Sequence, residues 1–140
     1  MDSDQRLNLA LQSVRFALGG TAFVAGADKF LNLLTDWEQY LSPIARRNLP
    51  ISERNFMRLV GVVEMVVGAS ILKGNTRIGG YVAAAWLLGI TGNLISSGKY
   101  FDIAARDLNM AVEAFVLATL TEATQAVSVR GPNQQIQQAA

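Results

Sequence analysis

The chain has 140 residues, of which 51% are hydrophobic and only 16% charged, against about 25% charged residues in an ordinary soluble domain. Its net charge of +1 provides no basic field, which excludes nucleic acid as an expected partner. The absence of cysteine and histidine excludes disulfides, Ser-His-Asp triads, and any cofactor held by cysteine or histidine ligands. We therefore expect a single domain with few charged side chains available to face water.

The hydropathy pattern predicts an all-α integral membrane protein, a four-helix bundle with up-down topology. In chain order we expect a lead-in over residues 1–13, a transmembrane domain over 14–122 and a flexible tail over 123–140. Within the domain, helices are predicted at about 11–34, 56–72, 78–98 and 103–121. The connections after the second and third helices are short, which favours antiparallel neighbours.

The first predicted helix argues for a membrane rather than a soluble bundle. Arg15, Gly26 and Lys29 fall on one narrow face lined by small residues, and large apolar side chains occupy the remaining circumference. A soluble amphipathic helix carries polar side chains over its broad outer face and apolar ones on the face that packs inward. Transmembrane helices instead pack through small residues and turn polar groups inward. The third helix has no charge over 21 positions, from Ile78 to Gly98, which is long enough to span a bilayer.

A longer segment between the first two helices, residues 35–55, contains Trp37 and Tyr40. Tryptophan and tyrosine are enriched where headgroups meet hydrocarbon. We therefore expect this segment to lie at a membrane surface.

Counting residues along the four helices places several polar side chains at one end of the bundle. With a rise of about 1.5 Å per residue, Lys29, Asn93 and Arg106 lie about 6 to 8 Å inside the same edge, and Glu64 about 12 Å. The predicted intramembrane cluster comprises Lys29, Glu64, Asn93, Asp102, Arg106 and Asp107, with flanking aromatics Trp37, Tyr40, Trp86 and Tyr100. Two interpretations remain open: a pocket that binds a small headgroup such as a quinone or passes protons, or an ion-paired plug that fixes helix register.

The order of these residues resembles the DoxX-like family of small membrane proteins. The resemblance rests on Gly26-Ala27-Asp28-Lys29-Phe30, on Gly61, Glu64 and Gly68, on Trp86 and Asn93, and above all on Asp102-Ile103-Ala104-Ala105-Arg106-Asp107. It implies a multi-pass, four-helix protein of the bacterial or archaeal cytoplasmic membrane. Some relatives are subunits linked to quinone-coupled sulfur oxidation, and others join complexes that handle oxidative stress.

Two functions are therefore expected. In the first, the chain is a non-catalytic or quinone-adjacent subunit of a membrane redox or respiratory assembly, at most the membrane subunit of a quinone-linked oxidoreductase. A second protein would then carry the redox cofactor, because this chain has no cysteine or histidine to hold one. In the alternative, it is a structural or assembly protein that packs against other transmembrane helices, and the polar cluster serves only its own fold.

Overall fold

The structure, a computed structural model, describes the backbone of residues 2–138 and the side chains of residues 2–127. The regular elements of the described chain are all helices, with five α-helices and one short 3-10 helix. The elements are α1 (Ser3–Leu31), η1 (Trp37–Tyr40), α2 (Pro43–Asn48), α3 (Glu53–Leu72), α4 (Thr76–Ser96) and α5 (Phe101–Gln138). The all-α class is confirmed, whereas the short α2 adds a fifth helix to the four that were predicted.

Helix α1 begins at Ser3, where the sequence predicted a lead-in through residue 13. A capping box explains the early start, because the Asp2 side chain accepts from the backbone N–H of Gln5 and the Gln5 side chain accepts from that of Asp2. At its other end, Asn32 adopts a left-handed conformation with φ 51° and donates its backbone N–H to Asp28, which ends the helix three residues before the predicted boundary.

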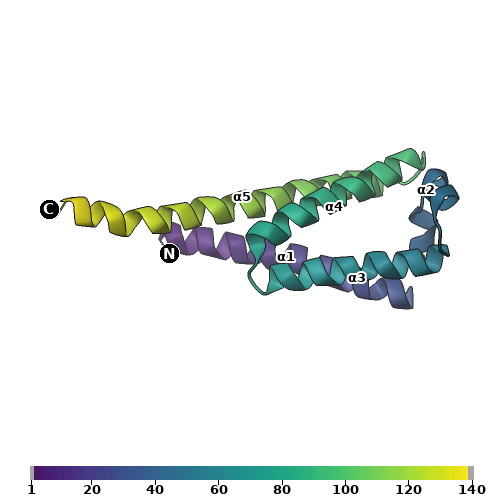
Figure 1. Ribbon diagram of the computed structural model, residues 1–140, viewed down its shortest axis with the longest axis horizontal. Helices are drawn as coiled ribbons and strands as arrows, with labels where there is room; N and C mark the ends of the chain where they lie inside the picture. The colour runs from purple at the N-terminus through teal and green to yellow at the C-terminus, as the bar shows by residue number, and fades with distance from the viewer. Residues whose placement is uncertain (1, 139–140) are drawn as a thin grey trace.

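Helix α5 continues to Gln138, where the sequence predicted a flexible tail from residue 123. The residues that follow the predicted end include Glu122, Ala123, Gln125 and Ala126, all favourable in helices. Because α5 runs antiparallel to α4, it extends well past the start of α4, as Figure 1 shows.

The four long helices form two antiparallel pairs, α1 with α3 and α4 with α5 (Figure 1). In the first pair the backbones touch at Gly26 and Gly61. A Cβ atom built on Gly26 would lie 2.6 Å from the Gly61 carbonyl oxygen, and one on Gly61 would lie 2.5 Å from the Gly26 oxygen. The small-residue faces of α1 and α3 thus pack against each other inside the protein.

The two pairs meet near the α3–α4 turn and separate toward the opposite end (Figure 1). A hydrophobic core fills the closed end, with Leu18, Ile71 and Leu117 at its centre. Thr76 and Thr121 share a hydrogen bond of 2.9 Å there, which ties α4 to α5. At the open end, the segment 32–52 between α1 and α3, called the cap segment below, covers the space between the pairs.

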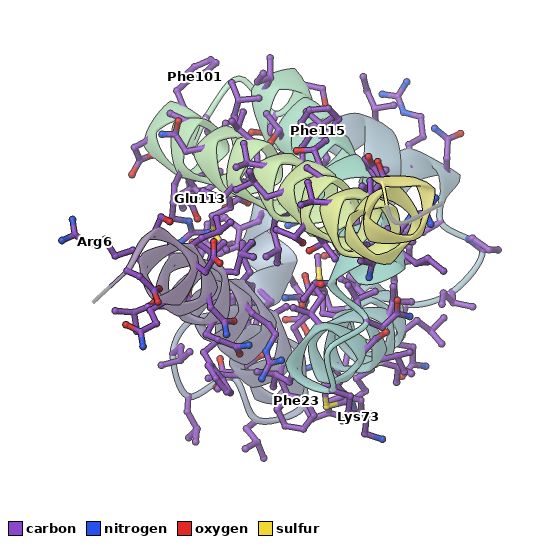
Figure 2. The ribbon with its side chains drawn as sticks, turned by 90° about the vertical axis from the view of Figure 1, so that its left-hand side faces the viewer. Arg6, Phe23, Lys73, Phe101, Glu113 and Phe115 are labelled. Carbon is purple, nitrogen blue, oxygen red and sulfur yellow. The ribbon has the colours of Figure 1, made fainter. Side chains whose placement is uncertain are left out.

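Each of the four long helices exposes large hydrophobic side chains on the outer surface of the described chain. Large hydrophobic side chains such as Phe23, Phe101 and Phe115 are exposed, and Figure 2, a view along the long axis, shows Phe101 pointing away from the helices. Helices α1, α3 and α4 are long and apolar enough to cross a membrane. Because α5 packs along α4, it follows the same path, although its own composition is more polar.

Candidate functional site

A cavity of about 1010 Å³ lies between the two helix pairs, beneath the cap segment. All four long helices contribute to its walls, which are mostly apolar. Its exposed lining residues include Ala17, Thr21 and Val24 of α1 and Arg106 of α5. Because most of these exposed lining residues belong to α1, the cavity is open to the outside along this helix. Its volume is at the upper end of the range for small-molecule sites.

The cavity's most buried charges form an ion pair between α1 and α3. Lys29 Nζ donates to Glu64 Oε2 at 2.5 Å, and the two side chains are 5% and 10% exposed. The ammonium group also lies 3.6 Å from the centre of the Trp37 ring, a cation–π contact. The pair joins two helices that already pack together, so it does not bridge the space between the helix pairs.

Asp28, next to Lys29, holds the start of the cap segment. Its carboxylate accepts from Trp37 Nε1 at 2.8 Å and from the backbone N–H groups of Leu33 and Leu34 at 3.0 to 3.2 Å. Sequence reasoning omitted Asp28 from the candidate site. The available signal was an acid in the last turn of an apolar helix, a place where a carboxylate needs dedicated donors.

Asn93 of α4 holds the middle of the cap segment. Its side chain accepts from the backbone N–H of Ser42 at 3.0 Å and donates to the carbonyl oxygen of Tyr40 at 2.7 Å. The Tyr40 ring stands edge-on to Tyr100 with centroids 4.9 Å apart. Asn93 therefore fastens the cap segment to the second helix pair, while Asp28 fastens it to the first.

The outer side of the cap segment is tied to α3 by exposed charges. Arg54 binds Glu38 at 2.6 Å, and Arg46 binds Glu53 at 2.8 Å. Burial raises the pKa of the Glu38 carboxyl above its ordinary value and Asp36 adds to the rise, although Arg54 opposes both. These pairs lie where the sequence predicted a surface segment.

The structure brings together most of the predicted cluster. Lys29, Glu64, Asn93, Arg106 and Asp107 line the cavity, together with the aromatic residues Trp37, Tyr40 and Trp86. Arg106 Nη2 pairs with Asp107 Oδ1 at 2.8 Å, with side chains 60% and 8% exposed.

Asp102 and Tyr100 lie apart from the cavity walls. Asp102, in the first turn of α5, is exposed and does not line the cavity. Tyr100 contributes through the Tyr40 ring instead. Its left-handed conformation, with φ 58°, places it at the sharp turn into α5.

Comparison with known proteins identifies a family. The sequence model of the family described as "Methylamine utilisation protein MauE" matches residues 7–103, more than half of the chain. No curated protein and no solved structure shows a significant match. The expectation of a small integral membrane family is confirmed, although the matching model is MauE and not the DoxX-like family that the motifs resemble. The chain belongs to the MauE family of membrane proteins.

Proposed function

We propose that this protein is a membrane subunit that holds a neutral amphiphile, of the quinone type, between its two helix pairs. It would serve a redox or respiratory assembly of a cytoplasmic (inner) membrane. The observation that carries the proposal is the cavity itself, which is large, apolar over most of its walls and polar near the cap segment. This distribution suits a small polar headgroup attached to an apolar tail.

The charges of the cavity favour a neutral headgroup. Four charged residues line it, and they form two opposite pairs: Lys29 with Glu64, and Arg106 with Asp107. A phosphate or carboxylate would have to compete with a carboxylate already bound to each cation. A neutral headgroup avoids that cost and the cost of burying another charge in a medium of low dielectric constant.

The proposal places the electron carrier on another protein. The chain has no cysteine or histidine, and its described residues contain no group of three or more acidic side chains placed to bind a metal ion. The family description names methylamine utilisation, and for this chain we propose only a supporting role within a redox-related assembly. Purification in mild detergent is expected to recover a second, cofactor-bearing protein. Repeated recovery of the bare chain without that protein would contradict this part of the proposal.

Occupancy of the cavity can be tested with two matched glycine variants on α4. Gly89 lines the cavity, and Gly92 lies one turn further along and outside it; a Cβ atom on either meets nothing within 4 Å. Both Gly89→Leu and Gly92→Leu are therefore expected to fold. The probe is a benzoquinone with a decyl tail, added to the full chain in lipid nanodiscs.

Binding is read from quenching of the two tryptophans, both of which line the cavity. Gly89→Leu is expected to weaken saturable quenching at least tenfold, since its side chain enters the ligand's space, whereas Gly92→Leu should match the unmodified chain. Equal binding by Gly89→Leu, or no saturable quenching in the unmodified chain, would refute the proposal.

A second candidate function, assembly of a membrane complex, is favoured by a polar face on α5. Asp102, Arg106, Asn109 and Glu113 recur at helical spacing and are all exposed. Glu113 lies twelve residues past the start of α5, about 18 Å along it, where a lipid-facing carboxylate costs about 2.5 to 3.5 kcal/mol. In Figure 2 it projects from the side of α5 turned toward α1.

Such a face suits a transmembrane helix of another protein that supplies a hydrogen-bond donor or a cation opposite Glu113. The double variant Asn109→Leu/Glu113→Leu is then expected to abolish co-purification of the partner while leaving quinone binding unchanged. Co-purification at the level of the unmodified chain would exclude this face as the docking site.

A further inference from the structure

The cavity is open to the outside along one face of α1. Ala17, Thr21 and Val24 line the cavity and are exposed at the same time. Their spacing of four and three residues puts them on one face of the helix, called the α1 opening below. The lining residues of α3 are all buried or half-buried, and α4 and α5 each contribute a single exposed one, Gly89 and Arg106.

The α1 opening lies at the depth of the lipid tails. The glycine contact between α1 and α3 described above and a second one, between Gly19 and Gly68, fix how the two helices lie along each other. They place Thr21 level with Val66, which is six residues, or about 9 Å, inside the end of α3. Because α3 is long and apolar enough to cross a membrane, lipid tails rather than water surround the α1 opening.

The polar groups of the cavity lie further along α1, at the end that the cap segment covers. Lys29 is eight residues past Thr21, a distance of about 12 Å along the helix. Hydrogen bonds to Asp28 and Asn93 hold the cap segment over this end. A ligand whose headgroup reaches these polar groups would therefore have its tail directed toward the α1 opening.

We propose that the cavity takes up its ligand sideways from the hydrocarbon of the bilayer through the α1 opening, and that the ligand's tail stays in this opening. The inference rests on the proposed function and adds the source of the ligand and the path of its tail. A tail that moves from lipid into an apolar opening never meets water, so entry avoids a cost of about 0.8 kcal/mol per CH₂ group. The ligand class is a lipid-dissolved amphiphile with an alkyl or isoprenoid tail.

Photo-labelling locates the tail directly. The probe is the decyl-tailed benzoquinone with a diazirine at the end of its tail, added to the full chain in phosphatidylcholine liposomes. After illumination, peptide mapping by mass spectrometry should find labelling of residues 16–25 that disappears when the benzoquinone without diazirine is in excess. Val62 and Val66 of α3 are exposed and lie outside the cavity at a similar depth. Their labelling comes from the surrounding lipid and should not be displaced.

A pair of matched double variants tests the route of entry. Ala17→Phe/Thr21→Phe narrows the α1 opening, and Val62→Phe/Val66→Phe adds the same rings with the same spacing to the outer face of α3. All four side chains are exposed, so both variants are expected to fold, which helical circular dichroism and gel filtration check. After rapid mixing with the benzoquinone in nanodiscs, tryptophan quenching should be at least tenfold slower in the first variant and unchanged in the second. Uptake of the probe by the bilayer is common to both, so the difference reports entry into the cavity.

The outcomes separate this inference from the proposed function. Displaceable labelling that spares residues 16–25, as expected for entry from water at the cap segment, would overturn the inference and leave the proposed function intact. Quenching as fast in a folded Ala17→Phe/Thr21→Phe variant as in its control would do the same. Absence of saturable quenching in the unmodified chain would overturn both. If the Ala17→Phe/Thr21→Phe variant does not fold, photo-labelling of the unmodified chain decides the question alone.

Discussion

The ion pair between Lys29 and Glu64 allows a quantitative test of what stabilises the first helix pair. The two side chains are 5% and 10% exposed and meet at 2.5 Å, so removal of either leaves an uncompensated charge in an apolar interior. Such a change costs about 3 to 5 kcal/mol. Lys29→Met also removes the contact with Trp37, which adds about 0.5 to 2 kcal/mol. Each single variant is therefore expected to lower the free energy of unfolding substantially, and Lys29→Met more than Glu64→Met.

The double variant Lys29→Met/Glu64→Met should be more stable than either single variant, because no buried charge remains and both replacements are unbranched and of similar length. It should recover all of the stability lost in the single variants except the cation–π part, which gives a coupling energy of about 6 kcal/mol or more. The assay is unfolding of the full chain by SDS in mixed micelles, followed by helical circular dichroism.

The matched control for this cycle is Arg77→Met, which breaks the exposed ion pair between Arg77 and Glu122. The Arg77 side chain is 58% exposed and that of Glu122 is 39% exposed. It is expected to cost about 0 to 1 kcal/mol. If Lys29→Met and Glu64→Met each cost as little as the control, or if their effects simply add in the double variant, the argument from burial and pairing is refuted.

Three further predictions follow from the packing and from the cap segment. Gly61→Ala should lower the free energy of unfolding by about 1 to 3 kcal/mol or more, because its Cβ would lie 2.5 Å from the Gly26 carbonyl oxygen. The control Gly92→Ala should be neutral or stabilising by up to about 1 kcal/mol. Equal effects of the two variants on unfolding by SDS would contradict this prediction. Asn93→Ala should speed tryptic cleavage after Arg46 by removing both hydrogen bonds to the cap segment, and an unchanged cleavage rate would show that other contacts hold it. Carbonate washing should leave the chain in the membrane pellet, and its release would contradict the membrane assignment.

The sequence determined where polar groups lie along the helices. Because the rise per residue is fixed, counting placed Lys29, Glu64 and Asn93 near one end of the bundle, and all three line the cavity. The segment with Trp37 and Tyr40 was likewise expected at that end, and it covers the cavity. These properties depend on distance along one helix, which the order of residues specifies directly.

Outside the small-residue faces of α1 and α3, tertiary structure alone decided which side of a helix faces inward. In a bilayer both the protein interior and the lipid are apolar, so hydrophobicity does not orient a helix about its axis. This is why Asp102 was predicted inside and lies outside, and why Asp28 was overlooked although it is buried. The cavity depends on tertiary structure for the same reason. Close contact at Gly26 and Gly61 joins α1 to α3, the core around Ile71 joins the pairs at one end only, and the space left between them is a property of the assembled helices.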